Sequence, residues 1–298
     1  MSSPDYAQEM SETHVVLTGT GVPHAAPGRA GAGVMIKHED VILQFDAGRG
    51  TVLRVIEAGV QPTDITAVFV THYHSDHVMD LPDVVITHWV QQQMKKTSPL
   101  QIIAPAGPAS RFVGRMMDPF DDDIHIRREH TGAPDPRFEA QSFVPTFTPA
   151  EVWRSVDGVV VVEAVAVHHE PVEAAVAYRI TTPNGVVVVS GDTRACDEVF
   201  SMAAGCDVLV HEACRKQSMI DSIRGTVFET ILDYHADSVA VGELAQKYNV
   251  KHLVLTHLIP QPHSEIEAEK FADDVRKGGY TGRITVGNDL LRVTIPQG

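Results

Sequence analysis

Four residues that commonly bind metal ions lie within one short stretch of the sequence. The segment THYHSDH, residues 71–77, places His72, His74, Asp76 and His77 directly after the apolar run ITAVFV. The run is typical of a buried strand, so the segment is expected to form the loop that leaves it, a usual place for a functional site. His72 and His74 can converge on one ion, while Asp76 and His77 can serve a second ion nearby.

Imidazole and carboxylate ligands together favour zinc over magnesium or calcium, although manganese and iron stay open as alternatives. The other interpretation of the segment is a histidine-rich surface loop that binds nothing. Four ligand-type residues in an H-x-H-x-D-H array after a buried strand favour the metal site.

Short apolar runs rich in β-branched residues recur along the chain and predict strands that are buried on both faces. The candidate strands are 14–19, 33–46, 65–72, 100–105, 159–169, 174–181, 185–192, 207–213, 252–257 and 283–295. Helical patterns lie between them, at 49–59, 79–96, 108–117, 196–205, 236–249 and 264–278. This order predicts an α/β fold, an αββα sandwich of two mixed β-sheets flanked by helices.

The sequence predicts a flexible N-terminal tail, residues 1–13, followed by a single domain over residues 14–298. Residues 118–158 are rich in proline and aspartate and are expected to form an irregular insertion or flap over one end of the domain. The N-terminus lacks the apolar core of a signal peptide, and no apolar run reaches the roughly 18 residues of a membrane span. Three scattered cysteines without CxxC spacing favour a reducing, cytoplasmic location.

The overall charge argues against polyanionic partners. The formal net charge is −15, and the densest basic spots, MKK at 94–96 and IRREH at 126–130, are short. A nucleic acid or a membrane surface would therefore be repelled at long range unless a local basic patch outweighs the total. We expect no membrane partner.

Several segments, in order, carry a resemblance to a known family. THYHSDH resembles the T-H-x-H-x-D-H signature of the metallo-β-lactamase fold superfamily, and other segments are similar to its ribonuclease Z and arylsulfatase-like branch. These segments are LTGTGVPHAAPGRAGAG (17–33), LQFDAGRGT (43–51), HEPVEAAVAYRI (169–180), SGDTR (190–194), HEA (211–213), YHADSVAVGELA (234–245) and LTHLIP (255–260). The resemblance extends over about residues 14–295 and implies the metallo-β-lactamase fold.

The resemblance also implies a centre of two zinc ions. It assigns His72, His74 and His169 to one ion, Asp76, His77 and His257 to the other, and Asp192 to both. His168 competes with His169 for its position, and His169 is preferred because it fits the family pattern H-x-P-V. His169, Asp192 and His257 each end an apolar run, which independently predicts that they gather at one edge of the sandwich.

For catalysis, the expected nucleophile is a hydroxide that bridges the two ions, and Asp76 could orient it. His235 matches the histidine of the ribonuclease Z H-S/T-T segment and is a candidate general acid, or equally a structural residue at a helix N-terminus. Glu212, in HEA, could orient His235 or support a metal-binding histidine. Arg194 could bind an anionic group of the substrate, or pair with a carboxylate.

The substrate is the least constrained feature. Ribonuclease Z has a basic arm that grips tRNA, but the corresponding residues 118–139 hold seven acidic and three basic side chains. We therefore expect nucleic acid to be an unlikely partner. The expected function is a dinuclear hydrolase of a small ester-type molecule: a sulfate ester, phosphodiester, carboxylic ester or lactone.

Three alternatives stay open: a ribonuclease Z-type endonuclease that processes tRNA 3′ ends, a hydrolytic dehalogenase of an activated aromatic, and a non-catalytic metal-binding module. Several aromatic residues could line an apolar substrate pocket, or could simply pack the loops. They are Trp89, Phe120, Phe138, Phe143, Phe147 and Trp153. The resemblance also implies a homodimer.

Overall fold

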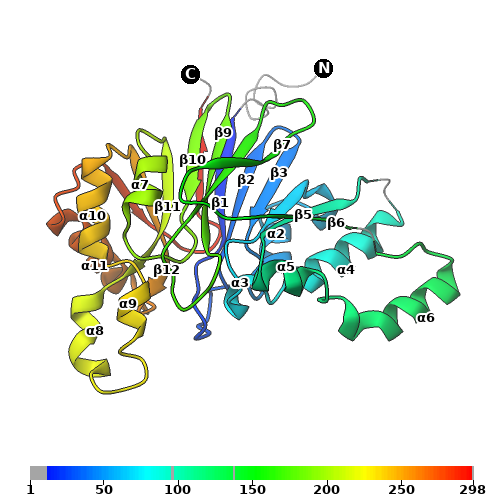
Figure 1. The fold of residues 1–298 in the computed structure, drawn as a ribbon, viewed down its shortest axis with the longest axis horizontal. Coiled ribbons are helices and arrows are strands. Elements are labelled where there is room, and N and C mark those ends of the chain that lie inside the picture. Colours follow the sequence, from blue (N-terminus) through cyan, green and yellow to red (C-terminus); the bar gives the residue numbers. More distant parts are fainter. Residues whose placement is uncertain (1–11, 95–96, 137, 297–298) are drawn as a thin grey trace.

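Two β-sheets of seven strands each face one another in the computed structural model, which describes residues 12–94, 97–136 and 138–296 (Figure 1). The first sheet has the order β14-β1-β2-β3-β4-β5-β6. Its strands are β1 Thr13–Gly19, β2 Gly33–His38, β3 Val41–Phe45, β4 Ala67–Phe69, β5 Leu100–Pro105, β6 Phe138–Phe143 and β14 Arg292–Ile295. The strands from β3 to β6 run parallel and the others antiparallel, so the sheet is mixed.

The second sheet has the order β13-β12-β11-β10-β9-β8-β7. Its strands are β7 Ala150–Arg154, β8 Val161–Ala166, β9 Val176–Thr182, β10 Gly185–Val189, β11 Val208–Cys214, β12 His252–Ile259 and β13 Arg283–Val286. The strands from β10 to β13 run parallel and β7 to β10 antiparallel. Both sheets therefore combine a parallel half with an antiparallel half.

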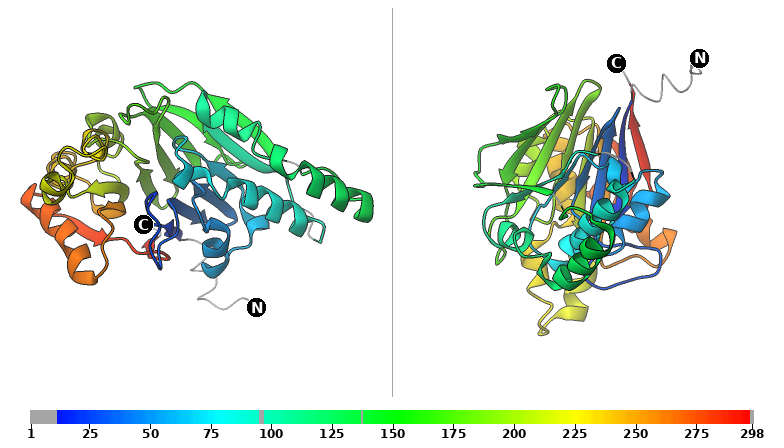
Figure 2. Two further views of the ribbon diagram at one scale, coloured as in Figure 1. Left: turned by 90° about the horizontal axis from the view of Figure 1, so that it is seen from below. Right: turned by 90° about the vertical axis from the view of Figure 1, so that its right-hand side faces the viewer.

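Helices cover the outer face of each sheet (Figure 1 and the left view of Figure 2). The first sheet is covered by α2 Thr51–Glu57, α4 Leu81–Gln92 and α5 Pro108–Val113, and the second by α7 Asp197–Met202, α10 Ser238–Lys247 and α11 Glu265–Lys277. Shorter elements are η1 Pro62–Asp64, α3 Ser75–Val78, η2 Asp118–Phe120, α6 Asp121–Thr131, α8 Lys216–Ile223 and α9 Ile231–Tyr234. The predicted αββα sandwich is confirmed.

The apolar runs are nearly continuous because both faces of the central strands are buried. In β1, Val15 and Leu17 point into the core between the sheets, while Val16 packs against the outer helices. The same alternation places Phe69 between the sheets and Val68 under the helices. Successive side chains of a strand point to opposite faces, so a strand buried on both sides needs apolar residues at every position.

The segment 118–158 is more regular than predicted. It contains η2 and α6, followed by β6 and β7, which form one edge of each sheet. The strand β6, with the sequence FEAQSF, exposes most of its side chains, and polar residues are usual on edge strands because they discourage pairing with other chains. The low apolar content of β6 thus reflects its edge position, and the expected insertion over residues 118–158 stays a prediction.

The predicted division into a tail, residues 1–13, and one domain, residues 14–298, stays a prediction. Residues 1–11 lie outside the described part, and β1 begins at Thr13, one residue before the expected boundary. Among the described residues, no helix is both long and apolar enough to cross a bilayer. Cys196, Cys206 and Cys214 are free thiols.

One buried tyrosine links the two sheets, and its removal offers a test of the fold. The Tyr178 hydroxyl on β9 donates a hydrogen bond of 2.7 Å to the Val70 carbonyl, which follows β4 in the other sheet. Tyr178→Phe should lower the free energy of unfolding by about 1–2 kcal/mol, because a buried carbonyl loses its donor. Urea denaturation measures the change.

The control is Tyr248→Phe, since the Tyr248 hydroxyl donates to Asp197 at the surface. We expect its stability to stay within about 0.5 kcal/mol of the parent. Equal losses in the two variants would show that the Tyr178 bond does not tie the sheets.

Candidate metal centre

The ligand-type residues gather at one edge of the sandwich, where strands of both sheets end. The segment between β4 and α3, together with α3 itself, carries His72, His74, Asp76 and His77. The second sheet contributes the other three from the ends of β8, β10 and β12: His169, Asp192 and His257. This edge lies opposite the one at which β1 begins and β14 ends (Figure 1). Six of the seven are buried and His74 is partly exposed. The structure brings all seven together, while their assignment as metal ligands stays a prediction.

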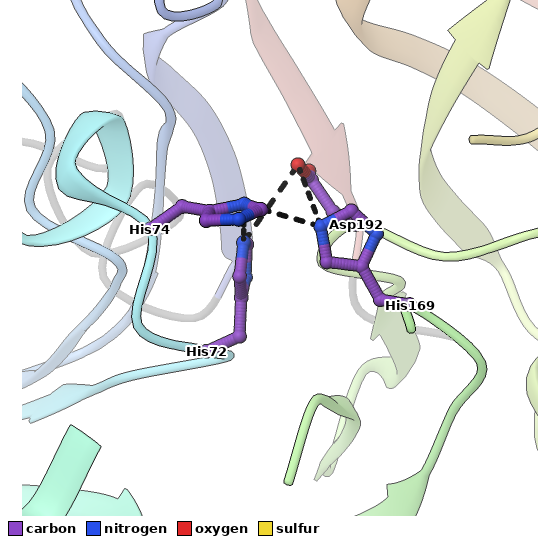
Figure 3. Close-up of side chains that lie close together, drawn as sticks. All are labelled: His72, His74, His169 and Asp192. Carbon is purple, nitrogen blue, oxygen red and sulfur yellow. Dashed lines mark hydrogen bonds and ion pairs between the residues drawn. The ribbon is translucent and has the colours of Figure 1, made fainter. Parts of the chain in front are cut away.

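The first group surrounds a single point (Figure 3). The Nδ1 atom of His74 lies 3.0 Å from His72 Nε2 and 3.2 Å from His169 Nε2. The Oδ2 atom of Asp192 lies 3.8 Å from both Nε2 atoms. Two imidazole nitrogens bound tetrahedrally to one zinc ion would lie about 3.3 Å apart, so the spacing fits a zinc site.

The second group shares the Asp192 carboxylate with the first. His77 Nε2 lies 3.3 Å and His257 Nε2 3.4 Å from Asp192 Oδ2. Asp76 Oδ2 lies 3.3 Å from His257 Nε2. Although His77 Nε2 and Asp192 Oδ1 are buried, neither makes a hydrogen bond. Buried polar atoms are nearly always satisfied, so these two atoms fit a site built for cations.

The electrostatics favour metal-binding protonation states in the first group. Burial, together with the neighbouring His77, holds the pKa of His72 well below its usual value, and burial beside His169 lowers the pKa of His74 to about 4. Neutral imidazole is the form that binds metal. Burial would raise the pKa of Asp192, but His257 and the other histidines outweigh it and hold that pKa well below its usual value.

Asp46 fixes the orientation of two ligands. Its Oδ2 accepts hydrogen bonds of 2.7 Å from His77 Nδ1 and from Thr71 Oγ1, and its Oδ1 accepts one from the Thr71 amide. Because the Thr71 hydroxyl donates to Asp46, it is left to accept from His72 Nδ1 at 3.0 Å. Both rings thus turn Nε2 toward the centre.

Sequence reasoning did not assign Asp46. The signal was present, since this acidic residue ends the apolar run VILQFD in a segment that carried the family resemblance. Asp46 and His257 also adopt left-handed backbone conformations, with φ of 57° and 44°. Such strained positions are common at functional sites, where the surrounding structure holds them.

A glycine in the same segment allows the loops to approach closely. A Cβ atom at Gly48 would lie 2.1 Å from the backbone oxygen of Asp76. The Ala47 amide donates to the His77 carbonyl at 2.7 Å, so the 46–50 loop packs directly on α3. Only glycine fits there, which explains the small residues of the segment DAGRG.

His235 and Glu212 form a buried pair beside the centre. His235 Nδ1 lies 2.9 Å from Glu212 Oε1 and donates to it, because a carboxylate only accepts. Glu212 also accepts from the amides of Thr193 and Ala236, so its position is fixed from three sides. The centroid of the His235 ring lies 5.5 Å from that of His257 and 5.1 Å from that of His169. Because Nδ1 is the nitrogen that contacts Glu212, Nε2 is free of the carboxylate.

The helix that follows this pair, α10, begins with Asp237 as its N-cap, which accepts from the Val239 amide. His235 is therefore not the N-cap of α10. It is the C-cap residue of α9, and its ring lies against those of His169 and His257. The carbonyl of the preceding residue, Tyr234, accepts from His169 Nδ1 at 3.0 Å. Sequence analysis missed this backbone contact, which no residue type signals.

A cleft of about 410 Å³ opens onto the centre. His74, Asp76, Asp192, His235 and His257 line it, as do residues that the sequence did not single out: Val22, Pro23, His24, Ser75, Val227, Phe228, Ile231, Tyr234 and Ile259. The additional residues come from the loop after β1, from α3, from the region of α8 and α9, and from β12. The ligands are therefore accessible from one side.

Two residues expected to bind substrate do not line this cleft. Trp89 is buried in α4, where its indole N–H donates to the Pro134 carbonyl at 2.8 Å, so it packs α4 against the chain that follows α6. Arg194 points to Glu170, with 3.3 Å between Nη2 and Oε2, which is the ion-pair alternative. Trp153 packs between the sheets and donates to Gln101.

Comparison with known proteins places this site in a family. Residues 44–258 match the family model described as beta-lactamase superfamily domain. A ribonuclease Z of Mycobacterium bovis (strain BCG / Pasteur 1173P2) is 34% identical over 285 residues, which cover 94% of this chain and 98% of that protein. A ribonuclease Z of Mycobacterium marinum is also 34% identical, and the match covers 94% of this chain and 98% of that protein.

Solved structures with the same fold are more distant in sequence. The metallo-beta-lactamase fold protein YhfI of Bacillus subtilis superposes with a TM-score of 0.70 at 20% identity, over 95% of this chain and all of its own. The short form of human tRNase Z superposes with a TM-score of 0.66 at 21% identity. The match covers 95% of this chain and 99% of that protein. On the strength of the family model and the curated relatives, the chain belongs to the ribonuclease Z family of the metal-dependent beta-lactamase superfamily.

Proposed function

We propose that this hydrolase is a ribonuclease Z-type endonuclease that cleaves precursor tRNA at the metal centre. The observation that carries the proposal is the ligand cluster with its His235–Glu212 pair, in a chain that matches ribonucleases Z along nearly their whole length. The short form of human tRNase Z, which shares the fold, suggests tRNA as the class of RNA.

The expectation that nucleic acid is an unlikely partner was wrong, because the curated relatives are ribonucleases. The error came from total charge and from the acidic residues 118–139. Charge is screened over about 8 Å at physiological ionic strength, so distant carboxylates have little influence on the cleft. The acidic helix α6 projects at the far end of the molecule from α10 and α11 (Figures 1 and 2).

For the metal we propose two zinc ions, one held by His72, His74 and His169, the other by Asp76, His77 and His257, with Asp192 shared. Bound zinc would supply Lewis acidity and a water of lowered pKa for attack on the phosphodiester. The expected cytoplasmic location and the homodimer stay predictions.

The protein's own groups would orient the reactants and move the protons. Asp76 lines the cleft and can accept a hydrogen bond from the attacking water. When the bond between phosphorus and the leaving ribose oxygen breaks, that oxygen needs a proton. His235 can donate it from Nε2, because Glu212 holds Nδ1 and so fixes the orientation of the ring.

Removal of the shared carboxylate tests the metal centre. Asp192→Ala should lose about one zinc ion per chain or more and should slow cleavage of precursor tRNA roughly 10³-fold, since metal catalysis contributes several kcal/mol. Zinc content is measured by inductively coupled plasma mass spectrometry, and circular dichroism monitors folding. His168→Ala is the control, because His168 pairs with Glu198 instead. A metal-free variant that cleaves normally would refute the mechanism.

The contribution of Asp46 is tested through metal affinity. Asp46→Asn keeps the size of the side chain but removes its charge, so His77 and Thr71 are held less firmly. Zinc affinity should fall about 10- to 100-fold. Competition with a chromophoric chelator measures the affinity. Asp40→Asn, in the exposed turn after β2, should keep the parent value. If Asp46→Asn also keeps it, Asp46 does not orient the ligands.

The general acid is tested with two leaving groups. His235→Ala should slow hydrolysis of precursor tRNA roughly 10²- to 10⁴-fold, because a ribose oxygen leaves poorly without a proton. Bis(p-nitrophenyl) phosphate should be much less affected, since p-nitrophenolate leaves as an anion. The two rates are compared on the same zinc-loaded preparation. Equal losses would assign His235 a structural role.

A further inference from the structure

A second cleft adjoins the metal centre on the other side of α3. Its volume is about 750 Å³, and it lies between α3 and α4 on one side and α5 and η2 on the other. Ser75 lines both clefts, so the two adjoin at the start of α3. Tyr73, which lines the second cleft, stands in the chain between the ligands His72 and His74.

The walls of this cleft present aromatic and thioether groups to solvent. The rings of Tyr73 and Phe112 lie 5.3 Å apart at an interplanar angle of 45°. Tyr73 is 42% exposed and Met79 is 61% exposed, and Phe120 completes the apolar lining. Exposed aromatic rings beside a catalytic centre are suited to flat, apolar ring systems, and nucleobases stack on such surfaces with little regard to sequence.

The residues that line the cleft include one guanidinium group and two carboxylates, and a phosphate can be bound at the guanidinium group. Arg115 lines the cleft and Arg111 lies one helical turn earlier on α5; both are exposed, and neither has an acidic partner among the described residues. Several other arginines of the described residues are paired with carboxylates, as Arg127 is with Asp123 and Arg154 with Glu151. Asp83 and Asp118 also line the cleft, and Asp83 accepts from Thr87.

We propose that this cleft binds a nucleobase of the single-stranded RNA segment that runs through the metal centre, with the base stacked against Tyr73 and Phe112. Arg115 then lies beside the adjoining phosphate. The inference rests on the proposed function. The shared border with the metal cleft at Ser75, and Arg115 without an acidic partner among the described residues, favour RNA over a peptide or a second copy of the chain.

The experiment reads stacking directly. Precursor tRNAs carrying 2-aminopurine at successive positions around the cleavage site are mixed with the zinc-loaded protein in a stopped-flow instrument, because stacking on an aromatic ring quenches this base. Quenching of at least about twofold is expected at one position. Phe112→Leu, which keeps apolar volume but lacks a ring, should lose the quenching and bind RNA about 10-fold more weakly. Phe112→Tyr should retain both.

Arg115→Gln should weaken RNA binding and make it less dependent on salt, since one phosphate contact is lost. Ile126→Ala, at an exposed position of α6, is the control and should behave as the parent. Zinc content of every variant shows that the metal centre is intact.

The outcomes separate the two proposals. If the parent protein cleaves precursor tRNA but no position shows quenching that depends on Phe112, the nucleobase cleft is wrong and the proposed function stands. If the parent neither binds nor cleaves the RNA, the proposed function fails and the inference falls with it.

Discussion

The Asp192 carboxylate lies between four imidazoles, and the rest of the site depends on this arrangement. Its Oδ2 atom is within 3.8 Å of a nitrogen of His72, His77, His169 and His257. Burial of an unpaired carboxylate costs several kcal/mol, so the carboxylate can be buried only where cations or donors surround it. The surrounding groups come from the ends of strands in both sheets. The centre can therefore assemble only when the two sheets pack together, and the inter-sheet hydrogen bond of Tyr178 supports that packing.

Orientation of the ligands needs a second set of residues. His72, Thr71, Asp46 and His77 form a hydrogen-bonded chain within the first sheet, whereas His169 is fixed by the Tyr234 carbonyl near the second. Each contact occupies Nδ1 and so directs Nε2 toward the centre. Without them the rings could rotate, and the spacing that suits zinc would be lost.

The sequence was sufficient for features that rest on residue type and order. Apolar runs predicted the central strands, and the H-x-H-x-D-H array with the strand-end His169, Asp192 and His257 predicted the cluster. Edge strands such as β6 were not predicted, because most of their side chains are exposed and polar and form no apolar run. The sequence showed an acidic residue at position 46 but not that it orients metal-binding histidines. The contact of the Tyr234 carbonyl could not be predicted, because every residue has a carbonyl. Trp89 was expected to line a substrate pocket but is buried in α4, because an aromatic residue in a helix can pack in the core as readily as it can bind a substrate.

The relation between charge and substrate follows from distance. Total charge governs approach from far away, but groups within a Debye length govern binding. Many basic side chains of the described residues are paired with carboxylates and contribute little attraction, whereas Arg115 lines the second cleft without an acidic partner among those residues. An acidic chain with a few free guanidinium groups at its site would bind RNA weakly overall and strongly only where the strand enters the cleft. Under the proposed function, affinity for non-specific RNA would then be low, and stacking and the metal centre would discriminate between RNA substrates.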